Sequence, residues 1–355
     1  MSKIKLGVVF GGMSTEHDVS ITSGTSVIKN LNKDKYEIYP VYIDKEGNWF
    51  EYTKKIQDID VLEVGENIEE KSKIMNPIEY LQECDVIFPV LHGLYGEDGT
   101  IQGLLELMNK PYVGCKVLSS SVCMDKVYAK FIFENSNIEQ AKYIYIRKVK
   151  DEYIYIDKEF NEKKCTLEEI ADIVKDKLKY PVFVKPSNSG SSVGINKAKD
   201  DKELFEYIEY ASKLDKKILI EKAIKGKEVE CAILGNEDIE ASGVGEILSA
   251  EEFYSFDAKY KNSASKTVIP ADIPKDITEQ IRKIAKKAYK ALDCKGFARV
   301  DFFIEEKTNR IIIIEINTIP GFTQISMYPK LWEQEGLKYS DLLDKLIELS
   351  LEEKK

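Results

Sequence analysis

Four polar residues on two apolar segments near the carboxyl end of the chain suit metal and phosphate chemistry. Arg299 and Asp301 fall in the segment GFARVDFF. Glu315 and Asn317 fall in the segment IIIIEIN, which follows after a polar turn. The pattern predicts two strands, and residues two apart in a strand share a face. Each strand therefore presents both of its polar residues on one side.

The second of these strands is β-branched and apolar, so a carboxylate inside it needs a compensating partner. Asp301, Glu315 and Asn317 offer hard oxygen ligands of the kind that Mg²⁺ or Ca²⁺ prefers, and phosphate oxygens commonly complete a Mg²⁺ site. The alternative is a buried salt bridge between Arg299 and Glu315, because structural ion pairs also occur in cores. We favour the metal-phosphate interpretation.

The bulk composition is that of a globular protein with well-developed cores. The chain has 355 residues, a formal net charge of -10 and a pI near 5.1. This balance argues against a nucleic-acid partner, which usually meets a basic face. We find no apolar run of the ~18 residues that span a membrane and no signal-peptide pattern, so a cytoplasmic protein is expected. Six cysteines without a CxxC pattern predict reduced, packed thiols, and two histidines exclude a histidine-rich metal site.

The amino-terminal segment predicts a doubly wound α/β unit. The strand IKLGVVF is followed by GGMSTEHDVS, a glycine-rich turn and a helix start. Ser14 or Thr15 is a candidate helix cap, with Glu16 favouring the positive end of the helix. Alternatively, Glu16 faces the ammonium group of a ligand at the strand end. The pattern leaves both interpretations open.

A second loop, HGLYGEDG, follows the buried strand VIFPVL. Its glycines allow tight turns or a close approach of the backbone to a ligand. His92 and Glu97 lie on this loop and are candidates for substrate contact, although a structural histidine is equally compatible. Residues 49–76, between the two units, are charged and irregular and predict a surface excursion. The first domain is expected to end near residue 120.

The segment YPVFVKPSNSGSSVG predicts a strand that delivers Lys185 to a Ser/Gly loop. Small residues such as Gly190 and Ser191 leave backbone N–H groups free to line an anion, and Lys185 adds a point charge. A flexible hairpin tip is the alternative, since turns are often rich in Gly and Ser. The buried approach of the lysine favours phosphate binding. Lys126 and Lys130 lie on a preceding helix, where the pattern does not distinguish them from surface lysines.

Two further segments complete the candidate nucleotide site. KILIEKAIKGKE predicts a linker between strands, on which backbone groups could meet an adenine and a carboxylate could meet ribose hydroxyls. The long loop EEFYSFDAKYKNSASK holds Lys259 and Tyr260. Long loops between ordered segments are often lids over a site.

Taken together, the motifs STEHDVS, LHGLYGEDG, MDK, VKPSNSGSSVG, DAKY, ARVDFF and EINTIPGFTQISMYP resemble those of the D-alanine–D-alanine ligases of the ATP-grasp superfamily. The resemblance runs in order over nearly the whole chain. It implies an α/β and α+β fold with three parts: an N-terminal Rossmann-like domain over 1–120, a central ATP-grasp α+β subdomain over 121–216, and a C-terminal one over 217–355.

The resemblance also implies roles for individual residues. Those on the ATP phosphates would be Lys126, Lys185 and Lys259. Those on the adenosine would be Glu221, Lys222, Ala223, Ile224 and Glu228. Two Mg²⁺ ions, or Mn²⁺ in their place, would be held by Asp301, Glu315 and Asn317. The first D-alanine would meet Glu16, linked to Ser191 and Tyr260, with His92 and Glu97 nearby. The carboxylate of the second D-alanine, or the developing oxyanion, would meet Arg299, Gly321, Ser326 and Met327.

The implied activity is ATP-dependent ligation of two D-alanines through a D-alanyl phosphate, for peptidoglycan precursors, by a cytoplasmic homodimer that pairs through its N-terminal domain. Related ligases that form an ester product carry a histidine at the position of Tyr260, so tyrosine implies a peptide product. D-Serine as the second substrate is the closest alternative, because an apolar pocket rejects one extra hydroxyl weakly. Another ATP-grasp carboxylate-amine ligase and a nucleotide-binding regulator without catalysis are the remaining alternatives.

Overall fold

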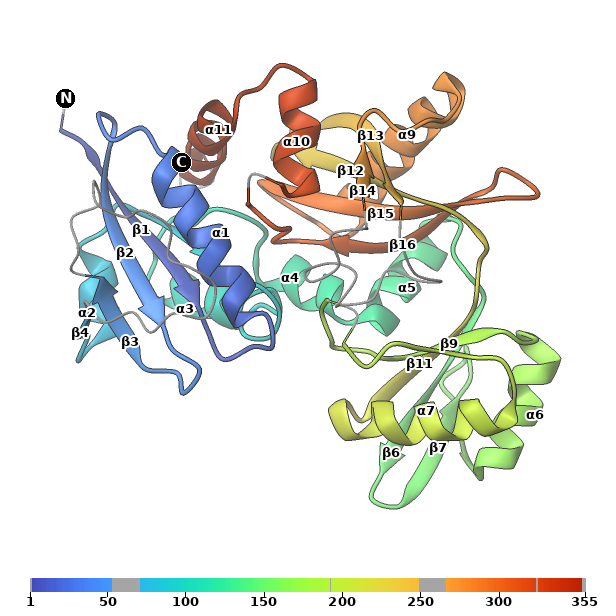
Figure 1. Ribbon diagram of the computed structural model, residues 1–355. Coiled ribbons are helices and arrows are strands. Elements are labelled where there is room, and N and C mark those ends of the chain that lie inside the picture. Colours follow the sequence, from blue (N-terminus) through green and yellow to red (C-terminus); the bar gives the residue numbers. More distant parts are fainter. Residues whose placement is uncertain (1, 53–70, 192, 249–265, 324, 353–355) are drawn as a thin grey trace.

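The computed structural model describes residues 2–52, 71–191, 193–248, 266–323 and 325–352. The strands of these residues form three sheets that follow one another along the chain (Figure 1). The N-terminal sheet is mixed, with two parallel and two antiparallel strand pairs, and the other two sheets are antiparallel. The predicted α/β and α+β fold class is confirmed.

The first sheet has the order β4-β3-β2-β1-β5, with β1 parallel to both of its neighbours. Its strands are β1 (Ile4–Gly11), β2 (Tyr36–Ile43), β3 (Trp49–Tyr52), β4 (Lys71–Lys73) and β5 (Val86–Val90). Its helices are α1 (His17–Asn30), α2 (Pro77–Gln82) and α3 (Thr100–Leu107). Parallel neighbours place the carboxyl ends of β1 and β5 at one edge, where the loops carrying Glu16 and His92 begin.

The predicted surface excursion over residues 49–76 is wrong at both of its ends. β3 pairs antiparallel with β2, and β4 pairs antiparallel with β3, so both strands extend the first sheet. The run WFEY places Tyr52 in the core cluster of this sheet, and that burial outweighs the charged neighbourhood. Residues 53–70 lie outside the described part of the chain.

The second sheet has the order β10-β9-β11-β6-β7-β8, and each neighbouring pair is antiparallel. Its strands are β6 (Tyr143–Val149), β7 (Glu152–Ile156), β8 (Glu162–Cys165), β9 (Val182–Pro186), β10 (Asn196–Ala198) and β11 (Lys217–Lys222). Helices α6 (Leu167–Lys177) and α7 (Asp201–Leu214) pack on it through Ile170, Leu204 and Ile208. The expected division at residue 216 falls just before β11, so the strands of this sheet run on to Lys222.

The third sheet has the order β14-β13-β12-β15-β16 and is antiparallel throughout. Its strands are β12 (Gly226–Leu234), β13 (Glu240–Leu248), β14 (Lys266–Val268), β15 (Phe297–Glu305) and β16 (Ile311–Asn317). Helix α9 (Lys275–Ala291) packs on β12 and β13. Helix α4 (Val117–Met124) contacts β16, and the sheet thereby gains cover from a segment far away in sequence.

Helix α5 (Lys126–Asn135) lies between the second and third sheets. Phe133 and Ala129 belong to the core of the third sheet. Val127 packs with Tyr145 and Leu219 of the second sheet. Because one helix serves both cores, the residues that it carries lie where the two sheets face one another (Figure 1).

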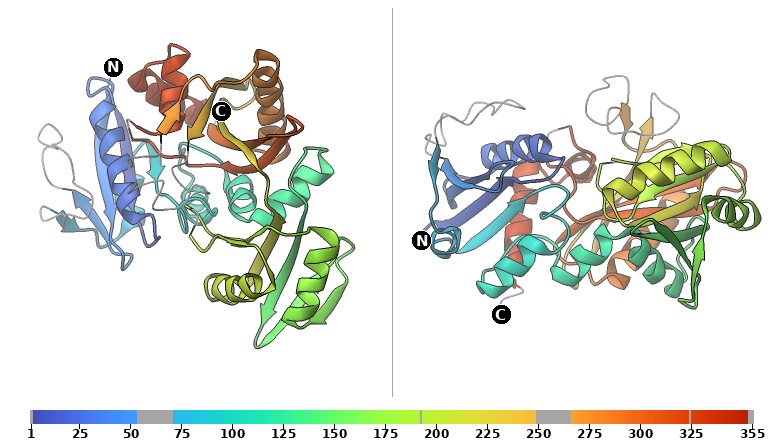
Figure 2. Two further views of the ribbon diagram at one scale, coloured as in Figure 1. Left: turned by 45° about the vertical axis from the view of Figure 1, so that its right-hand side comes forward. Right: turned by 90° about the horizontal axis from the view of Figure 1, so that it is seen from below.

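The last two helices are α10 (Met327–Gln334) and α11 (Tyr339–Glu352), and they return the chain to the first sheet. Leu343, Leu346 and Ile347 of α11 are fully or almost fully buried in one cluster with Leu6 and Val86. Both views in Figure 2 and the contacts of α11 with α1 and β5 agree on this placement. Among the helices of the described residues, none combines the length and apolarity needed to cross a membrane.

Candidate functional site

The paired strands β15 and β16 bring the four polar residues of the opening prediction together. Asp301 lies opposite Glu315, and Arg299 lies opposite Asn317. A register irregularity follows directly after Asp301. Such bulges re-aim side chains and are frequent beside functional sites. The predicted clustering of these residues is therefore confirmed by the register.

The ion pairs of Arg299 differ from the alternative considered on sequence grounds. Its guanidinium donates to both carboxylate oxygens of Asp301 at 2.7 Å, and its Nε lies 3.1 Å from Glu230 Oε2. Glu315 instead lies 3.4 Å from the Lys126 ammonium. Burial disfavours the charged guanidinium, but Asp301 and Glu230 outweigh it and raise the pKa of Arg299. Arg299 thus pairs with two acids, Asp301 and Glu230, whereas the alternative considered from the sequence was a salt bridge with Glu315.

The oxygen donors at this place fit a divalent cation. Asp301 is buried, Glu315 is half-buried, and the side-chain oxygen of Asn317 is buried with no hydrogen-bond partner among the described residues. An orphaned buried acceptor costs free energy unless something pairs with it. Across the described residues no group of three acid, histidine or cysteine side chains is placed to hold a metal, so the candidate set is two carboxylates and one amide.

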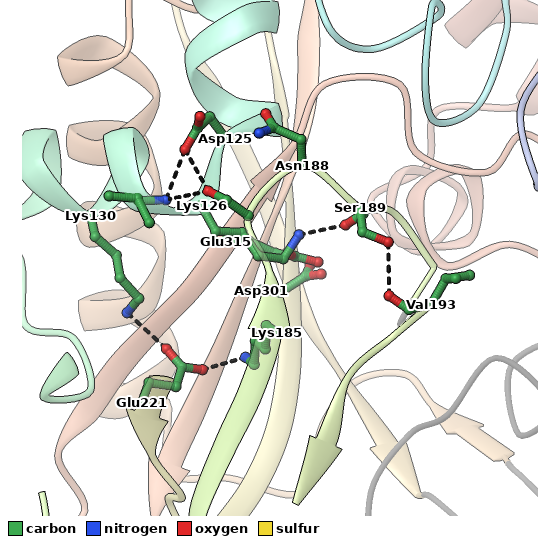
Figure 3. A network of polar contacts seen from close by, with 12 residues as sticks. Asp125, Lys126, Lys130, Lys185, Asn188, Ser189, Val193, Glu221, Asp301 and Glu315 are labelled. Atoms are coloured by element: carbon green, nitrogen blue, oxygen red, sulfur yellow. Dashed lines mark hydrogen bonds and ion pairs between the residues drawn. The ribbon is translucent and has the colours of Figure 1, made fainter. Parts of the chain in front are cut away.

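Lysines from α5 and β9 converge on the same region (Figure 3). Lys126, in the first turn of α5, donates to the Ser189 carbonyl at 2.7 Å as well as pairing with Glu315. Lys185 of β9 donates to one oxygen of Glu221, and Lys130 Nζ lies 2.9 Å from the other. Burial opposes charge on Glu221, yet the two ammonium groups outweigh it and lower its pKa to about 2. This arrangement is an ionised, water-poor cluster beside the metal donors.

The Ser/Gly loop after β9 reaches the N-terminal part of the chain. Ser191 donates a hydrogen bond to Glu16, which is 6% exposed. A Cβ added to Gly190 would collide with the Glu16 carboxylate, so the loop approaches this close only with glycine there. Neither Ser14 nor Thr15 caps α1, because Glu16 is itself the N-cap residue and its side chain makes no capping bond. The Glu16 carboxylate is aimed at the loop instead.

His92 is buried, and both of its ring nitrogens are engaged. Nδ1 lies 2.9 Å from the Ile319 carbonyl, and Nε2 lies 2.8 Å from Ser23 Oγ. Glu97 Oε1 lies 3.6 Å from Nδ1. Burial alone would lower the pKa of His92, but the carboxylates of Glu97 and Glu16 outweigh burial, so the pKa of His92 is raised. Burial raises the pKa of Glu97 to about 7. These bonds tie the loop after β5 to the segment after β16, as the structural alternative for His92 predicts.

In the linker after β11, two of the three residues expected to meet the adenine use their backbone N–H groups within the protein. Lys222 N–H donates to the Lys142 carbonyl, and Ala223 N–H donates to the Pro181 carbonyl. Among the described residues, Ile224 N–H donates to no backbone carbonyl. The Lys222 ammonium caps the carbonyls of Lys179 and Tyr180 at 3.0 Å. Glu228 follows on β12 and is half-buried.

The loop between β16 and α10 brings the last predicted residues together. Ser326 Oγ accepts from Thr323 N–H at 3.0 Å, and a Cβ on Gly321 would lie 2.8 Å from it. Met327 is the first residue of α10, so its N–H lies at the positive end of a helix whose N-cap side chain makes no capping bond. The Met327 side chain belongs to the core and takes no part in the site.

Two predicted residues, Lys259 and Tyr260, lie outside the described residues. Sequence reasoning missed Lys130, Glu230 and Asp125. Asp125 caps α5, and its carboxylate also accepts from Ser187 Oγ at 2.6 Å and from Lys217 Nζ at 2.5 Å. Asp125 directly precedes Lys126 in the motif MDK, and an aspartate just before a helix is a common signal for a helix cap. No sequence signal separates Lys130 from the surface lysines of the chain.

Two family models and several full-length relatives match the chain. The model described as D-ala D-ala ligase N-terminus matches residues 5–115, and that described as D-ala D-ala ligase C-terminus matches residues 132–348. A D-alanine–D-alanine ligase of Clostridium acetobutylicum is 50% identical over 348 residues, covering 98% of this chain and 98% of that protein. D-alanine–D-alanine ligase B of Clostridium tetani is 50% identical over 357 residues, covering 100% and 95%.

Solved structures give the same result. The VanG D-Ala:D-Ser ligase from Enterococcus faecalis superposes with a TM-score of 0.84 at 35% identity, over 98% of this chain and 100% of that one. The D-alanine–D-alanine ligase from Coxiella burnetii superposes with a TM-score of 0.81 at 32% identity, over 100% and 95%. The matched sequence models and the full-length relatives lead to one conclusion: the chain belongs to the D-alanine–D-alanine ligase family.

Proposed function

We propose that the protein joins two D-alanines into D-alanyl-D-alanine at the expense of ATP, through a D-alanyl phosphate. The observation that carries the proposal is the bond from Ser191 to Glu16 at one end of the Ser/Gly loop. At the other end of the loop, the Ser189 carbonyl holds the Lys126 ammonium beside Glu315. An amine-binding carboxylate and a phosphate-binding group thereby flank one loop.

The first step is phosphoryl transfer from ATP to the carboxylate of the first D-alanine. A carboxylate acylates poorly because its oxygen leaves badly, and phosphorylation supplies a good leaving group. Lys126 and Lys185, with Lys259, compensate the charge of the phosphates. Glu16 orients the first D-alanine through its ammonium group, and Ser191 holds Glu16 in place.

The second step is attack by the amine of the second D-alanine on the acyl phosphate. Negative charge then develops on the carbonyl oxygen of the tetrahedral intermediate, and donors aimed at that oxygen stabilise it. Arg299 and the N–H groups of Gly321 and Met327 are these donors, and Ser326 receives the carboxylate of the second D-alanine. Phosphate leaves without any covalent intermediate on the protein.

The nucleotide and metal are held by the groups between the second and third sheets. Glu221, Glu228 and the linker of Lys222, Ala223 and Ile224 bind the adenosine. Asp301, Glu315 and Asn317 would hold two Mg²⁺ ions, or Mn²⁺ in their place, and the orphaned Asn317 oxygen supports their role. Bound there, the ions would neutralise charge on the transferring phosphoryl group. His92 and Glu97 fix the loop that borders the first D-alanine.

The protein is proposed to act in the cytoplasm as a homodimer, on a peptidoglycan precursor. Its N-terminal part exposes apolar side chains that a second copy would cover, including Leu107 at 90% and Leu118 at 63% exposure. The substitution Leu118→Glu is expected to yield monomers in sedimentation analysis, and a monomeric unmodified protein would exclude the dimer.

The activity is tested by phosphate release from ATP and Mg²⁺ with D-alanine alone, beside L-alanine and D-alanine plus D-serine. Release with D-alanine alone, silence with L-alanine and dipeptide in the product are expected. Relatives at 45–50% identity over nearly the full length are named D-alanine–D-alanine ligases, which disfavours D-serine as the second substrate. Release only when D-serine is added would reverse that assignment.

A further inference from the structure

A buried glutamate held by two lysines at once is not explained by the proposed chemistry. Glu221 on β11 receives Lys185 on one oxygen and Lys130, at 2.9 Å, on the other. Two cations and one anion leave this cluster with one positive charge in excess. A buried excess charge calls for a counter-ion, and a phosphate is the anion that the nucleotide would supply.

The two lysines differ in what else they touch. Lys130 is 3% exposed, and its ammonium also lies 3.5 Å from Gln140 Oε1 and 5.1 Å from the centre of the Tyr143 ring. Lys185 is 9% exposed and lies on the side of Glu221 that faces Lys126 and Asp301 (Figure 3). Lys130 is therefore enclosed by the protein, whereas Lys185 borders the phosphate-binding region.

We infer that Lys130 is a positioning residue, which keeps Glu221 paired when Lys185 leaves that carboxylate to bind a nucleotide phosphate. The inference rests on the proposed function. Breaking one side of a buried ion pair is costly because it leaves an uncompensated charge. Lys130 removes this cost, since the Glu221 carboxylate retains a buried cation after Lys185 has turned away. Without Lys130, Glu221 and Lys185 form a neutral pair that competes with phosphate for Lys185.

The test is the affinity for ADP with Mg²⁺, measured by titration calorimetry on the full chain. Lys130→Met reduces the excess charge of the cluster from one to none, and its Kd for ADP is expected to rise about tenfold or more. Lys130→Arg keeps a cation beside Glu221, so its Kd for ADP is expected to stay within about threefold of wild type. The matched control Lys142→Met removes an exposed lysine just before β6 and leaves the Kd unchanged.

A merely structural role for Lys130 would move all steady-state constants together. The positioning role raises the KM for ATP in Lys130→Met and leaves the KM for D-alanine unchanged, and Lys130→Arg, which keeps the charge, recovers ATP affinity. Wild-type affinity for ADP in Lys130→Met would overturn the inference. So would a Lys130→Arg variant that binds ADP as weakly as Lys130→Met.

Lys130→Gln retains a side-chain amide that can donate to Glu221, so it keeps the test decisive if Lys130→Met does not fold. In that case, a Kd for ADP about tenfold above wild type in Lys130→Gln supports the inference, and near-wild-type affinity overturns it. Failure of the proposed function would give a different experimental result. Wild-type protein that binds ADP but releases no phosphate with D-alanine would overturn the activity while the affinity comparison still decides the role of Lys130.

Discussion

The Asn317 side-chain oxygen is buried without a hydrogen-bond partner among the described residues, and this orphan predicts the behaviour of one variant. Asn317→Ala should weaken Mn²⁺ binding in the presence of ADP by about tenfold, because one of three protein oxygen donors is lost. Its free energy of unfolding should hardly change, since no protein hydrogen bond is broken. Free Mn²⁺ measured by electron paramagnetic resonance checks the first expectation, and urea unfolding checks the second.

The control for Asn317→Ala is Asn161→Ala, in an exposed turn of the second sheet. It should leave Mn²⁺ binding unchanged. Equal Mn²⁺ affinity in the Asn317→Ala variant and the wild type would remove Asn317 from the metal site.

Glu97 predicts a pH dependence of stability. Burial raises its pKa from 4.5 to about 7, so between these values the folded protein binds more protons than the unfolded chain. Stability therefore falls as pH rises through this window and stays at the lower level above it. The raised pKa of His92 acts in the same direction, with its loss above pH 6.5.

The Glu97→Gln variant should lose most of this slope, because glutamine does not titrate. Urea unfolding of both proteins at several pH values between 4.5 and 8 makes the comparison. The same slope in both proteins would show that Glu97 has an ordinary pKa in the fold.

At the scale of single elements, helix α5 depends on one residue. Asp125 caps its first turn by accepting from Val127 N–H and Tyr128 N–H, and it also pairs with Lys217 of β11 at 2.5 Å. Burial raises the pKa of Asp125, but Lys217 and Ser187 outweigh it, so the pKa is lowered and the carboxylate stays ionised. The residue therefore ties α5 to the second sheet as well as starting the helix.

Asp125→Ala is expected to reduce the free energy of unfolding by about 1–2 kcal/mol for the lost cap, and further because Lys217 loses its partner. Thr166→Ala is the matched control, since Thr166 caps α6 in an exposed capping box and pairs with no cation. It should cost about 1 kcal/mol or less. Chemical unfolding of both variants checks the difference, and equal losses would assign Asp125 a capping role alone.

Elements with strong local patterns could be predicted from the sequence, and elements defined by distant contacts could not. The strands around Asp301 and Glu315 are apolar, β-branched and joined by a short polar turn. The sequence therefore predicted both the pairing of the two strands and the face that their polar residues share. Lys130 has the same local surroundings as any helical lysine, and only packing against β11 buries it. Glu230 was missed for the same reason, because its pairing with Arg299 depends on the neighbouring strand β15.

At the scale of the whole molecule, the last helix completes the first sheet. Leu346 of α11 is 1% exposed and packs in the cluster that contains Leu6 and Phe88. Leu346→Ala should therefore cost about 2–5 kcal/mol of stability. Lys345→Ala, at the neighbouring exposed position, should change it by less than about 0.5 kcal/mol. Thermal unfolding checks both, and a neutral Leu346→Ala variant would show that α11 is not part of this core.

The return of α11 to the first sheet has a consequence for synthesis on the ribosome. Domains generally fold in the order in which they leave the exit tunnel. Here the first sheet is translated long before the α11 side chains that close its core. The nascent chain must carry an apolar sheet face uncovered until α11 has left the tunnel, so we expect the ribosome-bound intermediate to bind chaperones and to resist proteases only after α11 has emerged.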